Sequence, residues 1–226
     1  MRPSFLFLFL LAPYLSQSNP YPPPRYSGPS PPLTPSQSSI LSSILTSRPR
    51  TGLSGPFGPW LTSPLLCDAS QNLGKAVRYD TTFTPKESEM IILTTAAWTG
   101  CIAEFDIHCT EALKAGLGVH VIRGIWGEMG DGGGWGEGGV ERIKAIAESE
   151  GLGLLAEFVA RLLEGKGEVD DGLYMRAVEE LGVKKVVEAV GIVGYYSYVA
   201  MTLKCFRVKP EVTNLEALGL HTEKIN

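Results

Sequence analysis

Residues 89–116 read EMIILTTAAWTGCIAEFDIHCTEALKAG, and this stretch decides the fold. Two helical patterns meet in it at a Thr-Gly step, because glycine interrupts a helix and favours a turn. The first helix begins at Thr84, where Thr-Pro-Lys-Glu forms a capping box with proline at the first helical position. The second begins near Cys101 and ends at Gly116, a typical C-terminal glycine. The stretch therefore predicts two consecutive helices joined by a tight turn.

Polar side chains recur along one face of the second helix at spacings of three, four and three residues, which stack them together. They are Cys101, Glu104, His108 and Glu111. The neighbouring stripe is apolar and predicts the core contact, so this face lies at the flank of a buried surface. We expect Asp106, Thr110 and Lys114 to face solvent, and Glu111 to be solvated or ion-paired.

Glu89 lies among apolar residues on the first helix. A carboxylate in such surroundings is costly unless it is paired or hydrogen-bonded. His108 can exchange a proton near neutral pH, and a neighbouring carboxylate can fix its tautomer. The joint occurrence of Glu89, Glu104 and His108 therefore favours an acid–base site over a histidine that only packs in the core.

This pattern resembles the carboxymuconolactone decarboxylase-like family of the alkylhydroperoxidase D-like superfamily. The resemblance runs without a gap from Glu89 to His108 and on through EALKAGL, with weaker similarity in GLSGPFGPWLTSPLLCDASQNLG and VGYYSYVAMTLKCF. It implies a compact all-α multi-helix bundle that forms homo-oligomers with sites near subunit interfaces. It also implies a lyase acting on a small unsaturated carboxylate or lactone, in which Glu89, Glu104 and His108 carry the proton transfer.

Cys101 is the fourth candidate catalytic residue. The alkylhydroperoxidase relatives use a CxxC pair that ends four residues before the histidine, but here Glu104 replaces the second cysteine. Cys109 cannot take its place, because eight residues of helix span about 12 Å and a disulfide needs Cα atoms within about 7 Å. Two readings of Cys101 stay open: a peroxiredoxin-like reaction of this cysteine alone, or a thiol that only packs in the core. A non-catalytic binding protein of the same fold is a further alternative for the function.

Composition narrows the possible partners. Residues 1–67 carry +4 from four arginines and no acidic residue, so the net charge of −4 leaves −8 on residues 68–226. An acidic body argues against nucleic-acid binding. No CxxC or histidine-rich spacing supports a zinc site, and a di-iron bundle would need paired Glu-x-x-His repeats. The glycine-rich segment 130–139 lacks the preceding strand of a dinucleotide site, so we expect no metal and no cofactor, and a small-molecule substrate.

The two ends of the chain differ from its centre. Residues 1–18 have a positive start, an apolar run and small residues, which favours a secretory signal; a mitochondrial presequence or a cytoplasmic protein are the alternatives. Residues 19–38 are rich in proline and serine and predict a disordered linker. The helical domain is expected over residues 39–210 and a C-terminal tail over 211–226.

The last helix is expected over about residues 184–206, with an uncharged run at 189–203. That run is too short for a stable membrane span, so we expect a core helix surrounded by the others. Tyr195 and Tyr196 on this helix are candidates to line a pocket, although core packing explains them equally well. No stretch alternates with a period of two, which completes the all-α prediction.

Overall fold

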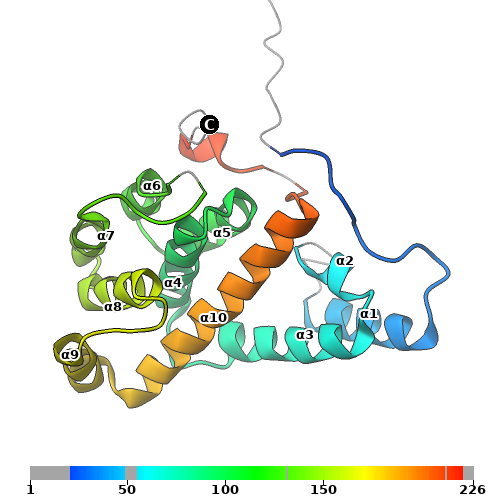
Figure 1. The fold of residues 1–226 in the computed structure, drawn as a ribbon, viewed down its shortest axis with the longest axis horizontal. Coiled ribbons are helices and arrows are strands. Elements are labelled where there is room, and N and C mark those ends of the chain that lie inside the picture. The colour runs from blue at the N-terminus through cyan, green and yellow to red at the C-terminus, as the bar shows by residue number, and fades with distance from the viewer. Residues whose placement is uncertain (1–20, 49–54, 131, 212, 221–226) are drawn as a thin grey trace, which may run out of the picture.

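The computed structural model describes residues 21–48, 55–130, 132–211 and 213–220. Within these ranges the chain forms ten α-helices and one short 3-10 helix, with no strand, so the all-α prediction is confirmed (Figure 1). The elements are α1 (Pro35–Ser47), α2 (Phe57–Trp60), α3 (Pro64–Tyr79), α4 (Pro85–Trp98), α5 (Ile102–Lys114), α6 (Val119–Gly127), α7 (Gly139–Glu148), α8 (Gly153–Glu164), α9 (Asp171–Leu181), α10 (Val183–Phe206) and η1 (Glu216–Leu218).

Helix α4 lies at the centre of the bundle, packed against α5, α6, α8 and α10 (Figure 1). Its start is the predicted capping box: the Thr84 hydroxyl accepts from the Glu87 backbone N–H, and the Glu87 carboxylate accepts from the Thr84 N–H at 2.7 Å. Every residue from 88 to 97 is buried. Polar side chains on α4, including the carboxylate of Glu89, must therefore find hydrogen-bond or ionic partners inside the protein.

A tight turn joins α4 to α5, as predicted. Gly100 has φ +59°, and a Cβ there would lie 2.9 Å from the backbone nitrogen of Gly133. Glycine is required on both counts, since other residues rarely adopt positive φ. Helix α5 then ends before Gly116, which has φ +86°. The turn lays α5 back along α4, so residues of the two helices can meet.

Helix α10 crosses the bundle, but it is not enclosed on all sides as predicted. Val187, Val190 and Met201 are 66%, 47% and 63% exposed, and they form one apolar stripe. By length and mean hydropathy α10 could cross a membrane, yet 56% of its most apolar window is buried inside the protein, as in a core helix. The expectation that other helices surround α10 on all sides is therefore wrong for this stripe, which no described helix covers. The homo-oligomer stays a prediction.

Residues 21–34 differ from the predicted disordered linker. They run in extended form along the helices to α1, which begins inside the expected linker after its own Thr34 capping box (Figure 1). The Arg25 N–H donates to the carbonyl of Phe206 at 2.9 Å, and the Tyr21 hydroxyl donates to Asp106 at 2.6 Å. Hydrogen bonds to the helices thus hold a segment whose composition supplies little apolar surface. The predicted targeting segment, 1–18, lies outside the described residues.

Asp106 corrects a second expectation. We expected it to face solvent, but it is fully buried. Its two carboxylate oxygens accept from the Tyr21 hydroxyl and from the Asn214 backbone N–H, at 2.6 and 2.7 Å. The helical spacing of α5 alone could not show that segments from both ends of the chain cover this side.

Candidate functional site

His108 lies on α5 between two carboxylates, and all three side chains are buried. Its Nδ1 is 2.7 Å from Oε2 of Glu89, which projects from α4. Its Nε2 is 3.3 Å from Oε1 of Glu104, one turn earlier on α5. The structure therefore brings together Glu89, Glu104 and His108, three of the four residues singled out from the sequence.

Arg78 and Tyr196 complete this group, and the sequence did not assign them a role in it. Arg78 on α3 donates from Nη2 to Glu89 Oε1 at 3.3 Å and from Nη1 to the Tyr196 hydroxyl at 3.3 Å, while Nη1 lies 3.2 Å from His108 Nε2. A signal was present: the buried stripe of α3 passes through Gln71 and Gly74, and Arg78 continues it at helical spacing. We call Arg78, Glu89, Glu104, His108 and Tyr196 the acid–base cluster.

Burial and charge oppose each other at His108. Burial lowers its pKa, but the negative charge of Glu89 and the contacts with Glu104 and Glu89 outweigh burial and the repulsion from Arg78, and raise the pKa to about 9. Burial also disfavours the charge of Arg78, yet Tyr196 and Glu89 raise its pKa above the ordinary value. Burial raises the pKa of Tyr196, so its hydroxyl keeps its proton. With both carboxylates ionised and His108 protonated, the charges of the cluster sum to zero.

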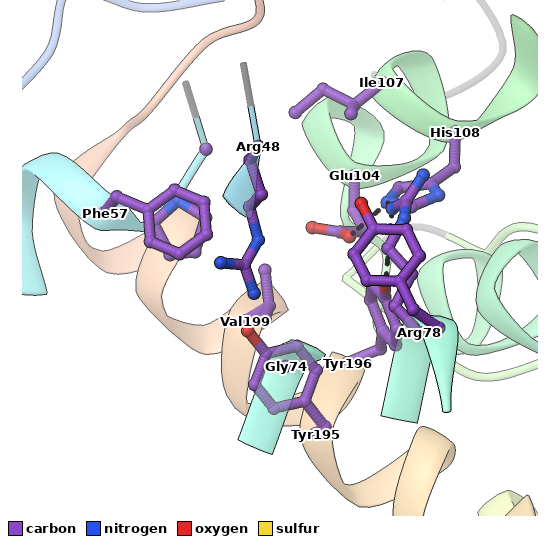
Figure 2. A pocket seen from close by; sticks show the side chains of 13 residues that line it. Arg48, Phe57, Gly74, Arg78, Glu104, Ile107, His108, Tyr195, Tyr196 and Val199 are labelled. Carbon is purple, nitrogen blue, oxygen red and sulfur yellow. Dashed lines mark hydrogen bonds and ion pairs between the residues drawn. The ribbon is translucent and has the colours of Figure 1, made fainter. Parts of the chain in front are cut away.

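A cavity of about 90 Å³ opens beside this cluster. Arg78, Glu104, His108 and Tyr196 line it (Figure 2), whereas Glu89 does not line the cavity and contacts His108 at Nδ1. Nδ1 contacts Glu89, whereas Nε2 contacts Glu104 and Arg78, which both line the cavity. Tyr195 lines the wall as well. Its ring fits there because residue 74 is glycine; a Cβ at this position would overlap the Tyr195 hydroxyl.

Cys101 lies apart from the cluster's cavity. It is the N-cap of α5, with φ −95° and ψ 86°, so its side chain does not follow the helical spacing that predicted a shared face with Glu104 and His108. Its Sγ is 3.9 Å from the carbonyl of Ala200, and it lines a separate cavity of about 260 Å³ with Tyr21. Burial and the charge of Glu104 raise its pKa to about 12.

The other sequence expectations around the site have simple outcomes. Glu111 is ion-paired with Lys114 at 2.6 Å, as expected. In the glycine-rich segment, Gly134 donates to the carbonyl of Trp98 at 2.6 Å, and a Cβ at Gly133 would lie 2.7 Å from the same oxygen. These glycines therefore allow close packing on the end of α4. Among the residues with described positions, no group of three or more His, Cys, Asp or Glu side chains is arranged to hold a metal ion.

Comparisons with known proteins found a matching family and a similar fold. Residues 64–136 match the model of the carboxymuconolactone decarboxylase family, and they include every member of the cluster except Tyr196. The chain is also similar to the crystal structure of an uncharacterized peroxidase-related protein from Silicibacter sp. TM1040, with a TM-score of 0.60, 11% identity, and coverage of 90% of this chain and 98% of that one. At that identity the likeness shows the fold alone. No curated protein matches the chain. The resemblance is thereby confirmed for residues 64–136, which match the carboxymuconolactone decarboxylase family model, and the chain shares the fold of the peroxidase-related protein.

Proposed function

We propose that the protein is a carboxymuconolactone decarboxylase-like lyase that acts on a small unsaturated carboxylate or lactone by proton transfer through His108. One observation carries the proposal: a buried histidine that lines a cavity is held between two carboxylates. The family match supports the class of reaction. The cavity, with space for roughly six to nine waters, suits a small substrate.

The reaction asks for a proton donor. When the bond from carbon to the substrate carboxylate breaks, carbon dioxide leaves and the electron pair spreads into the adjacent unsaturated group. His108 donates its Nε2 proton to that carbon, becomes neutral, and later regains a proton from water. With its pKa raised to about 9, His108 carries this proton at neutral pH.

The neighbours of His108 prepare it for this step. Glu89 accepts from Nδ1 and fixes the orientation of the ring. Once Nε2 has lost its proton it can accept a hydrogen bond from Arg78 Nη1, which already lies 3.2 Å away. Glu89 thus favours the charged form and Arg78 the neutral form, so both states of the donor have a partner.

The test is turnover of carboxymuconolactone in deuterated water, followed by carbon dioxide release and deuterium incorporation at carbon. His108→Gln should lower the rate by roughly 10²- to 10⁴-fold, the usual contribution of a general acid or base. His120→Gln is the matched control, since His120 is exposed on α6 and contacts Ser149. Equal rates in the wild type and His108→Gln would remove His108 from the mechanism, and binding without turnover would favour a non-catalytic binding protein.

A further inference from the structure

Tyr195 brings a buried hydroxyl to the cavity of the acid–base cluster. It lies on α10, outside the segment that matches the family, and only 6% of the residue is exposed. No residue that the structure describes makes a hydrogen bond with this hydroxyl. A buried tyrosine usually gives its hydroxyl a partner, because a polar group without one loses the hydrogen bonds that it made to water. The Tyr195 hydroxyl is therefore placed to bind a molecule in the cavity.

The neighbours of Tyr195 fix the position of its ring. The ring packs edge-on against Trp60, with 6.3 Å between centroids, and against Tyr196, with 5.3 Å between centroids. Its hydroxyl end lies over Gly74 of α3, where an added Cβ would come within 2.1 Å of the oxygen (Figure 2). This packing holds the hydroxyl oxygen at the cavity wall before any ligand binds, and a donor that is already in place stabilises a developing charge best.

The hydroxyl of Tyr195 keeps its proton. Burial raises its pKa above the ordinary value, although the cation of Arg48 acts in the opposite direction, and the negative charge of Glu104 raises it further. Tyr195 is therefore a neutral hydrogen-bond donor at neutral pH. Such a donor suits a carbonyl oxygen, which accepts a hydrogen bond in the substrate and accepts a stronger one when it gains negative charge in the reaction.

We infer that Tyr195 is a catalytic residue that donates a hydrogen bond to the carbonyl oxygen of an unsaturated lactone in this cavity. The inference rests on the proposed function, and it selects the lactone from the two substrate classes named there. When carbon dioxide leaves, the electron pair of the broken bond moves through the conjugated double bond to the carbonyl, whose oxygen becomes an enolate oxygen. Tyr195 stabilises that oxygen without giving up its proton. His108 then protonates the carbon, and the carbonyl forms again.

The binding test uses γ-butyrolactone and tetrahydrofuran, two neutral rings of the same size that differ by the carbonyl group. In calorimetric titrations of the full chain, the wild type should bind the lactone more tightly than the ether. Tyr195→Phe should weaken lactone binding roughly three- to tenfold, the usual net contribution of one hydrogen bond, and should leave ether binding within about twofold. The carbonyl infrared band of the bound lactone should also move to higher frequency in this variant, because a hydrogen bond lowers that frequency.

Tyr198→Phe is the matched control on the same helix. Its hydroxyl contacts the Ser70 hydroxyl at 3.3 Å, and Tyr198 is not among the described residues that line this cavity. Tyr198→Phe should therefore bind both probes as the wild type does, and thermal melting of each variant establishes folding. In turnover of carboxymuconolactone, Tyr195→Phe should lower kcat roughly 10²-fold, the usual cost of removing one donor to a developing oxyanion.

The outcomes separate the hydrogen-bond donor from the proposed function. Unchanged lactone binding and an unchanged infrared band in Tyr195→Phe overturn the inference, whatever the enzyme turns over. An equal loss in Tyr198→Phe, or a wild type that binds the lactone no more tightly than the ether, overturns it as well. If Tyr195→Phe loses lactone affinity but the wild type does not turn over carboxymuconolactone, the assignment of the donor is supported and the proposed function fails.

Discussion

Two cavities flank helix α5, and their chemistry differs. At the first, His108 lies within hydrogen-bonding distance of Glu104, of Arg78 on α3 and of Glu89 on α4, and Arg78 donates to the Tyr196 hydroxyl on α10. At the second, Cys101 has a backbone carbonyl at 3.9 Å and a pKa that burial raises to about 12. Both residues belong to one motif on one short stretch. The comparison teaches that the partners supplied by other helices, rather than the spacing within α5, decide which of the two can exchange a proton.

The largest expected effect comes from removing the charge that holds His108. Glu89→Gln keeps the shape of the side chain but leaves the cations of His108 and Arg78 without their shared partner. Breaking a buried ion pair from one side costs about 3–5 kcal/mol, and we expect that loss in the free energy of unfolding by urea. Decarboxylation should fall by roughly 10²-fold, because the ring loses its orientation and its proton.

The matched control for Glu89→Gln is Glu111→Gln. Glu111 is on the next helix and pairs with Lys114 near the surface. An exposed pair contributes about 0.2–1 kcal/mol, so this variant should be nearly as stable and as active as the wild type. Similar losses of stability and activity in both variants would mean that the buried charges at the first cavity matter no more than a surface ion pair. The contrast between the two cavities would then fail.

A smaller effect follows from the titration of His108. Its pKa is about 9 in the folded protein, above the ordinary value of 6.5. A pKa that is raised on folding stabilises the protein fully below about pH 6.5, and this stabilisation is lost as the pH rises through about 9. The difference in unfolding free energy between the wild type and His108→Gln should therefore shrink between these values. A difference that stays constant across that range would show that His108 is not held as the cation.

The rate of turnover should also depend on the protonation of His108. If protonated His108 is the acid, kcat/KM falls above about pH 9, and this limb moves to lower pH in Glu89→Gln because the largest influence raising its pKa has been removed. An unchanged limb in Glu89→Gln would assign it to another group.

Much of this site could be predicted from the sequence, for identifiable reasons. The capping box at Thr84 and the turn at Gly100 fix where α4 and α5 begin and end, so the spacing of Glu104 and His108 transfers directly to the structure. Glu89 was recognisable because a carboxylate among apolar residues needs a partner.

The two misses have different causes. The side chain of Asp106 looked exposed because helical spacing does not record the segments at Tyr21 and Asn214 that cover it. Cys101 looked like part of the polar face because the spacing rule assumes helical backbone, which an N-cap residue does not have. Contacts made across long stretches of sequence leave no local pattern from which to predict them.

The smallest expected effect concerns Cys101, and it tests the comparison at the second cavity. With the pKa raised to about 12, roughly one thiol in 10⁵ is ionised at pH 7, so a reaction that needs the thiolate has almost no reactive form. Cys101→Ser should keep decarboxylation within about twofold, since the thiol lines the other cavity, and should cost at most ~1 kcal/mol of stability because the new hydroxyl can turn to the carbonyl of Ala200. Hydroperoxide consumption with dithiothreitol should be equally low in wild type and variant. Rapid consumption by the wild type that Cys101→Ser abolishes would assign the chemistry to the thiol, and it would mean that a residue only 1% exposed becomes accessible and ionises in solution.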